Sequence, residues 1–240
     1  MSEEKQAWWA RAVMIGGVFA IVALVLGPLG YRLFDSLAWL GLAAVATLMA
    51  LLTLLVGIIC FIIVMAKGRR AERGSLTIGS LLSVVVLGAM LPFFLMDVPP
   101  IHNISTDTQD PPQFDQIVAM RGDKSNPLEY DAETLAPQQQ KAYPDVKTLT
   151  LGQSPDAVVT KAGSVLEELG IEVVNVDAAK GIVEGTATTR WFGFKDDVVV
   201  RVRPSAEGSI VDVRSVSRVG QSDLGANAKR ILAILAGLQA

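Results

Sequence analysis

The run AVMIGGVFAIVALVLGPLG, residues 12–30, decides the architecture of this chain because it contains no charged residue. Its length is close to the ~20 residues that a helix needs to cross the hydrocarbon core of a bilayer. The run is too long for the apolar part of a signal peptide, and no small-x-small cleavage site follows it, which indicates a retained anchor. Uncharged stretches recur at residues 36–66 and 75–96. Three such stretches in succession indicate membrane helices, which we predict at about residues 12–31, 37–66 and 75–96 of a transmembrane region spanning 1–96.

The basic residues beside these stretches predict how the chain is oriented. Lysine and arginine are retained on the cytoplasmic side of a membrane. One side of the three spans carries only Arg32, whereas the other carries Lys5, Arg11, Lys67, Arg69, Arg70 and Arg73. We therefore predict a multi-pass protein of a bacterial inner membrane, with a cytoplasmic N-terminus and a periplasmic or other extracytoplasmic C-terminal part. The interiors of the spans hold no ionisable residue, which disfavours a carrier or channel.

Charge and cysteine content limit what the part beyond the membrane does. Residues 1–96 hold seven basic and four acidic residues, a net charge of +3, whereas residues 97–240 hold fourteen basic and twenty acidic residues, a net charge of −6. A net-acidic domain argues against nucleic acid as a partner, because phosphate binding needs concentrated positive charge. The single cysteine, Cys60, lies inside an apolar run, so the soluble part forms no disulfide.

The soluble part divides into a Pro-rich connector at 97–145 and a folded domain at 146–240. Two proline pairs in the connector favour extended or turning backbone over helix. The segment from Ser154, with Pro155 in its first turn and Gly170 as its stop, predicts a helix. A second amphipathic helix is expected from about Ser222 to the C-terminus. Strands are predicted at 146–151, 171–176, 181–190, 196–203 and 209–218.

Alternating side chains in the last two strands set the fold class. In DDVVVRVR, residues 196–203, and SIVDVRSVSR, residues 209–218, apolar positions alternate with charged ones. A turn at SAEG, with Gly208 in a left-handed position, places Arg201 opposite Asp212. We predict an α+β domain of order β-α-β-β-β-β-α: a mainly antiparallel sheet of about five strands with both helices on one face. The other face carries charged side chains, and the connector partly covers it.

Three stretches resemble a known family: VPPIHNISTDTQDPPQF at residues 98–114, FKDDVVVRVRP at 194–204 and VDVRSVSRVGQSDLGANAKRI at 211–231. They are similar to the bacterial and chloroplast family called domain of unknown function 1499, over about residues 97–238 of this chain. The resemblance implies a genuine domain, often anchored in membranes. It brings no established activity and no catalytic residues.

The loop SRVGQSDLGANAKR, residues 217–230, is the strongest local candidate for a site. Free amides and the helix dipole at its end could hold an anion, with Arg218 and Arg230 nearby. Alternatively Ser222 caps the helix and Asp223 satisfies its dipole. The second interpretation is favoured, because Asp223 already supplies negative charge where an anion would lie.

His102 is the only histidine, so a serine or cysteine hydrolase of the usual kind would need it as the base. A zinc site would have to combine it with Asp97, Asp107 or Asp110. Acidic residues between prolines are more typical of solvated turns, so we predict no catalytic residue, no metal and no cofactor. Trp191, with the phenylalanines around Gly193, either enters lipid, lines a ligand groove or closes the end of the sheet.

The leading functional hypothesis is a non-enzymatic binding or scaffold module of the cell envelope, which presents a charged sheet face or the loop at 217–227. Its partners are the lipid bilayer and another envelope protein or lipid. A lipid- or small-ligand-binding domain and an envelope hydrolase using His102 are the alternatives. The candidate binding residues are Arg201, Arg203, Arg214, Arg218, Ser222, Asp223, Asn227, Arg230 and Trp191.

Overall fold

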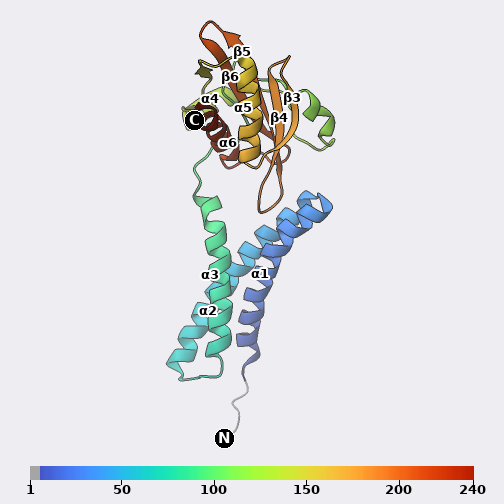
Figure 1. Ribbon diagram of the computed structural model, residues 1–240. Helices are drawn as coiled ribbons and strands as arrows, with labels where there is room; N and C mark the ends of the chain where they lie inside the picture. Colours follow the sequence, from blue (N-terminus) through green and yellow to red (C-terminus); the bar gives the residue numbers. More distant parts are fainter. Residues whose placement is uncertain (1–5) are drawn as a thin grey trace. The chain divides into compact units, whose positions relative to one another are not determined.

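The computed structural model describes residues 6–240 (Figure 1). Lys5, which contributes to the charge argument for orientation, lies outside the described residues. The chain divides into a helical unit that ends at Met96 and a domain formed by Asp97–Arg190 and Phe194–Ala240.

The helical unit contains α1 (Trp8–Phe34), the short 3-10 helix η1 (Leu37–Trp39), α2 (Leu40–Ala66) and α3 (Arg73–Leu95). Three helices, with η1 and α2 taken together, are long and apolar enough to cross a membrane. The prediction of three apolar N-terminal helices is confirmed. The first helix begins at Trp8, earlier than predicted. The predicted start followed the uncharged run, which begins after Arg11, but a helix can include a basic residue near its start.

Small residues let these helices approach closely. A Cβ built on Gly79 of α3 would collide with the Val13 carbonyl of α1, and one built on Gly17 would lie 2.5 Å from the Gly79 carbonyl oxygen. The Ser83 hydroxyl donates to the Gly79 carbonyl at 2.9 Å within the same helix. The small-xxx-small pair Gly79 and Ser83 therefore lies at a helix–helix interface, which is where such pairs pack in membranes.

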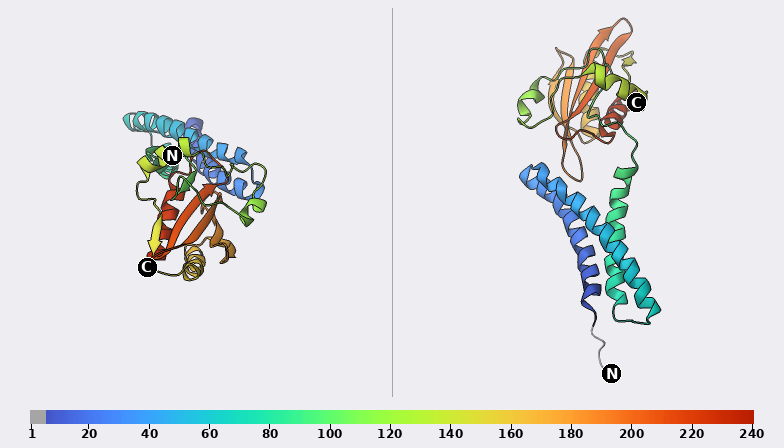
Figure 2. Two further views of the ribbon diagram at one scale, coloured as in Figure 1. Left: turned by 90° about the horizontal axis from the view of Figure 1, so that it is seen from above. Right: turned by 180° about the vertical axis from the view of Figure 1, so that it is seen from behind.

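The domain is built on a six-stranded sheet with the order β1-β6-β5-β4-β3, and β2 also pairs with β6 (Figures 1 and 2). All the pairings are antiparallel. This confirms the α+β fold class and adds one strand to the five expected. The strands are β1 (Asn103–Ser105), β2 (Leu149–Leu151), β3 (Glu172–Asp177), β4 (Ile182–Thr188), β5 (Lys195–Ser205) and β6 (Gly208–Ser217).

The β5–β6 hairpin has the register expected from its alternating pattern, with Arg201 opposite Asp212. Ser205 pairs with Gly208 across the turn, and Gly208 has φ +131. A side chain is disfavoured there, since an added Cβ would lie 2.9 Å from the Gly152 Cα as well as requiring a positive φ. The turn thus fixes which side chains of the two strands share a face.

Two helices, α5 (Pro155–Glu168) and α6 (Ala226–Gln239), pack on one face of the sheet and close the apolar core, as predicted (Figure 1). Valines of β5 and β6, such as Val200 and Val213, meet Leu166 of α5 and Ile231 of α6 in this core. Ser154 is the N-cap residue of α5, and Gly170 follows its end with φ +71. The last helix begins at Ala226, four residues later than the predicted Ser222, because Leu224 and Gly225 both have a positive φ that a helix cannot include.

The segment 97–145 is more structured than its prolines indicate. It contains β1, the 3-10 helix η2 (Gln116–Met120) and a further helix, α4 (Ala132–Ala142), which accommodates Pro137. The Asp131 side chain caps α4 by accepting the Thr134 amide N–H. Seen from behind, α4 lies on the side of the sheet away from α5 and α6 (Figure 2). Both faces of the sheet are therefore covered.

Candidate functional site

The charged face of the sheet is not open to a partner, because it is buried beneath residues 103–130. We call these residues the covering segment, or cover. Arg214 and Asp212 both have 0% of their surface exposed, and Asp197 and Glu184 are equally buried. Buried charges are tolerated where they are paired and hydrogen-bonded. The candidate site is thus a covered polar layer, and its contacts decide what it can do.

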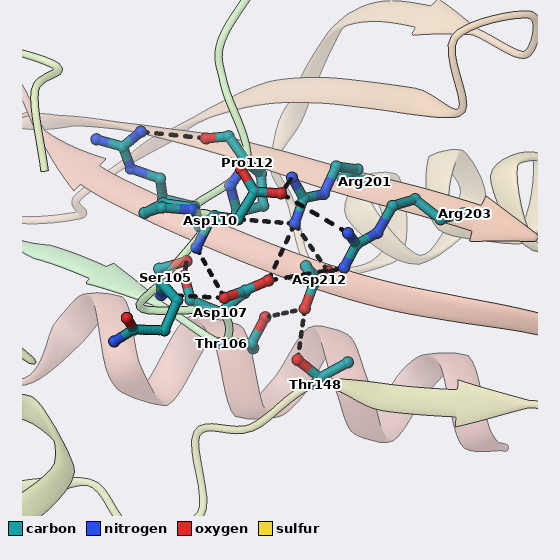
Figure 3. A network of polar contacts seen from close by, with 12 residues as sticks. Ser105, Thr106, Asp107, Asp110, Pro112, Thr148, Arg201, Arg203 and Asp212 are labelled. Atoms are coloured by element: carbon teal, nitrogen blue, oxygen red, sulfur yellow. Dashed lines mark hydrogen bonds and ion pairs between the residues drawn. The ribbon is translucent and has the colours of Figure 1, made fainter. Parts of the chain in front are cut away.

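Asp212 is the centre of one polar cluster (Figure 3). Its Oδ1 accepts hydrogen bonds from the hydroxyls of Thr106 at 3.2 Å and Thr148 at 2.6 Å. Its Oδ2 accepts from Arg201 Nη2 at 3.1 Å and Arg203 Nη2 at 2.7 Å. Thr106 also accepts the Val213 amide N–H at 2.9 Å, so the side chains extend the pairing of β6 with the segment after β1. One carboxylate therefore joins β5, β6, the residue before β2 and the covering segment.

The covering segment supplies further acids to the same arginines. Arg201 Nη1 lies 2.9 Å from Asp110 Oδ2, and its Nη2 lies 3.3 Å from Asp107 Oδ2 (Figure 3). Arg203 lies within 3.7 Å of Asp110 as well. The predicted binding residues Arg201 and Arg203 are thus brought together, but they bind acids of their own chain.

Arg214 is buried, and it forms no ion pair with a carboxylate in the part of the chain that the structure describes. Its Nε donates to Asn103 Oδ1 and its Nη1 to the Pro112 carbonyl, each at 3.1 Å, and its Nη2 donates to the Leu128 carbonyl. Its guanidinium lies over the rings of Phe114 and Tyr130, at 5.5 and 5.8 Å from their centroids. Burial lowers the pKa of Arg214 to about 10, and burial raises the pKa of Tyr130 to about 12. This arginine fastens the cover to the sheet and is inaccessible to a ligand.

Two more buried acids hold the rest of the cover. Asp197 accepts two hydrogen bonds from Arg218, at 2.8 and 2.9 Å, and pairs with Arg121 of the covering segment. Glu184 accepts the amide N–H groups of Asp115 and Gln116 at 2.7 and 2.9 Å, so it caps η2. Asp212, Asp197 and Glu184 thus each bind at least one group of the covering segment.

Asp196 lies on the opposite face from Asp197, as the strand alternation predicts. It pairs with Arg230 of α6 at 2.7 Å. Arg230 also donates to Ser215 at 3.0 Å, and the Asn227 amide donates to Ser217 at 2.9 Å and to the His102 carbonyl at 3.0 Å. Asn227 and Arg230 therefore join α6 to β6.

The loop before α6 uses its free amides internally. Asp223 Oδ1 accepts the Gly225 amide at 2.7 Å, and its Oδ2 accepts the Asn227 amide at 3.1 Å. The Ser222 hydroxyl accepts only the Leu224 amide, at 3.2 Å, inside the loop. Asp223, and not Ser222, thus caps the helix. Because these amides already donate to side chains of the loop, they are not free to hold an anion. Burial raises the pKa of the Asp223 carboxyl.

His102 lies beside this loop, with Nδ1 3.3 Å from the Gln221 carbonyl oxygen. The backbone beside His102 lies next to this loop, as the hydrolase alternative requires, because the Asp223 amide donates to the Ile101 carbonyl at 3.2 Å. The contacts of the side chains are different: Asp223 accepts amides of the loop and of α6, and His102 Nδ1 lies against the Gln221 carbonyl. Among residues 6–240, no three histidine, cysteine or acidic side chains are grouped to hold a metal ion.

Trp191 lies in the loop between β4 and β5, with 46% of its surface exposed. Trp191 lies outside the strands, six residues before Asp197 of the polar layer. The candidate residues consequently separate into the covered layer, the α6 junction and this loop.

A pocket of about 310 Å³ opens at the edge of the covered layer. It is lined by Thr106, Thr108, Gln139, Gln140, Tyr143, Pro144, Val146 and Lys147. Gln139 is one of these lining residues, and the backbone of Ser105 holds its side-chain amide. Its Oε1 accepts the Ser105 amide N–H at 3.0 Å, and its Nε2 donates to the Ser105 carbonyl at 2.7 Å. No local pattern in the sequence identifies this pocket, because its walls come from α4 and from residues on both sides of it. The sequence signal that was present is the excess of hydroxyl and amide side chains at 105–108 and 138–140.

The comparison with curated proteins finds no match. A family model, described as a protein of unknown function (DUF1499), matches residues 103–238. The matched range begins at β1 and ends in α6, so it includes the sheet, both core helices and the covering segment. The chain therefore belongs to the DUF1499 family.

Proposed function

We propose that this protein is a membrane-anchored, non-enzymatic binding module of the bacterial cell envelope, with its DUF1499 domain outside the cytoplasm. The observation that carries the proposal is the internal use of the charged side chains. Arg201, Arg203 and Arg218 each pair with buried acids of their own domain. Such a layer stabilises a rigid scaffold and leaves no acid–base couple open to a substrate.

The distribution of positive charge supports the orientation. Lys67, Arg69, Arg70 and Arg73 lie at or near the loop between α2 and α3, whereas only Arg32 lies near the loop between α1 and α2. Retention of basic loops in the cytoplasm would place the end of α3, and the domain that follows it, on the outer side.

Cysteine labelling tests this orientation. In a Cys60→Ser background, Glu207→Cys places a thiol at the exposed β5–β6 turn, and Arg70→Cys places a matched thiol in the exposed α2–α3 loop. We expect a membrane-impermeant maleimide to label the Glu207→Cys variant in intact spheroplasts. The Arg70→Cys variant should react only after the membrane is opened. The opposite pattern would overturn the proposal.

The pocket beside α4 is the recognition site that we propose for this module. Its volume of about 310 Å³ is at the lower end of the range of ~300–1,000 Å³ typical of small-molecule sites. The apolar space between the sheet and its helices is filled by core side chains, so a ligand would enter at the rim and not through the core.

A further inference from the structure

The chemistry of the pocket narrows the class of ligand, and this inference rests on the proposed binding function. Thr108 and Gln140 both line the pocket, and Gln140 Nε2 donates to the Thr108 hydroxyl at 3.4 Å. Hydroxyl and amide side chains both donate and accept hydrogen bonds. Tyr143 and Pro144 add apolar surface to the same lining, so a ligand that carries several hydroxyl groups on a carbon ring matches both parts of it.

Two of the side chains that line the pocket are held in place by hydrogen bonds within the domain. The Thr106 hydroxyl is held between Asp212 and the Val213 amide, and both ends of the Gln139 amide are bound to Ser105. A site whose polar groups are already fixed loses little conformational entropy when a ligand binds. Recognition therefore does not require the covering segment to rearrange.

The charge of the lining points to an anion. Among residues 6–240, no acidic side chain lines the pocket, and Lys147 is the one charged side chain in its lining. Lys147 is exposed and forms no ion pair with any residue of the described part of the chain, whereas the nearby Arg201 and Arg203 are paired with acids. An unpaired ammonium beside hydroxyl and amide groups attracts a single negative group.

We propose that this pocket binds a hydroxyl-rich anion of monosaccharide size, of the sugar-phosphate type, either free or as the headgroup of a lipid. The volume of about 310 Å³ equals the liquid volume of roughly ten water molecules at ~30 Å³ each, which suits one sugar ring with its substituent. Lys147 contacts the anionic group, and Thr108 and Gln140 contact the hydroxyls.

Binding is measured by calorimetry on the full chain in phosphatidylcholine nanodiscs, which avoids detergents with sugar headgroups. The probes are glucose 6-phosphate, glucose and inorganic phosphate. We expect glucose 6-phosphate to bind, and both partial probes to bind about fivefold more weakly or worse, since each lacks one set of contacts. Equal affinity for glucose 6-phosphate and either partial probe, or no binding of glucose 6-phosphate, would overturn the proposed ligand class.

Lys147→Gln should weaken glucose 6-phosphate binding about fivefold or more while leaving glucose binding unchanged. Lys141→Gln is the matched control, because Lys141 is an exposed lysine of α4 outside the pocket, and it should change neither affinity. If Lys141→Gln weakens binding as much as Lys147→Gln, the ligand responds to overall charge and the assigned site is wrong.

Nanodiscs that contain phosphatidylinositol distinguish the two sources of the ligand. Competition with glucose 6-phosphate in these nanodiscs assigns a lipid headgroup, and its absence assigns a free ligand. A failure to bind glucose 6-phosphate while the Glu207→Cys variant is labelled from outside would refute this inference alone. Labelling of the Glu207→Cys variant only after the membrane is opened would refute the proposed function, whatever the binding result.

Discussion

Replacing Asp212 by asparagine tests whether the buried polar layer holds the cover on the sheet. Asparagine keeps an oxygen that can accept from Thr106 and Thr148, but its NH₂ group then faces Arg201 and Arg203, which are donors only. The substitution therefore removes two charge-assisted hydrogen bonds and sets donor against donor. Removing one partner of a buried ion pair costs about 3–5 kcal/mol.

The lower end of this range applies to Asp212→Asn. Arg201 keeps Asp107 and Asp110 as partners, and Arg203 is partly exposed, so water replaces some of what is lost. We expect the free energy of unfolding of the domain to fall by about 3 kcal/mol. At ~1.4 kcal/mol for each factor of ten, this corresponds to about a hundredfold rise in the population of the open state.

Hydrogen exchange measured by mass spectrometry on the full chain reports this change. The peptides covering residues 103–112 and 208–217 should exchange about a hundredfold faster, because their slowest amides open with the domain. Asp110→Asn is the control, since Asp110 binds the same two arginines but is 67% exposed, and exposed pairs contribute under about 1 kcal/mol. Equal effects of the two substitutions would refute the argument that burial of Asp212 makes the difference.

Three further predictions follow from single positions. Burial raises the pKa of Tyr130 to about 12. The neutral phenol therefore contributes fully to stability below its ordinary pKa of about 10, and this contribution is lost as the pH rises through about 12. Tyr130→Phe should remove the last tyrosinate step of an ultraviolet titration. Asp223→Ala should lower the free energy of unfolding by about 1–2 kcal/mol because it removes the cap of α6, and Ser222→Ala should lower it less. Hydrogen exchange of the amides at residues 225–229 measures both changes. Gly79→Ile should lower the thermal stability of the helical unit in detergent because its Cβ meets the α1 backbone, whereas Gly88→Ile, with nothing within 4 Å, should not.

The parts of the fold that the sequence predicts are those set by local pattern. Uncharged length identifies the three apolar helices, and alternation of valine with arginine and aspartate sets the β5–β6 register. The start of α6 could not be placed the same way. Leu224 adopts φ +53, a conformation that a leucine rarely takes, and only the contacts of Asp223 with the following amides explain it.

The sequence predicts that the connector partly covers the charged face, but the residues that pair could not be predicted from local pattern, because β1 is three residues long and pairs with a strand more than a hundred residues away. A further sequence signal for the cover exists in the strands themselves. Val199 and Val216 lie on the same face as Asp212 and Arg214, and both valines are fully buried. Apolar residues on a face otherwise charged indicate that something packs against it. The run of three valines at 198–200 has no exposed side in this sheet.

The same layer bears on how an anionic ligand would reach the pocket. Residues 97–240 carry a net charge of −6, and Arg201, Arg203 and Arg218 of the covered face pair with Asp107, Asp110, Asp197 and Asp212. Long-range attraction therefore does not steer anions to the domain, and charges beyond the Debye length of about 8 Å are screened at physiological salt. Affinity must come from short-range contacts with Lys147 and the hydroxyl and amide groups around it. For this reason inorganic phosphate, which has the charge of the proposed ligand but none of its sugar hydroxyls, is the probe that most directly separates recognition from simple charge attraction.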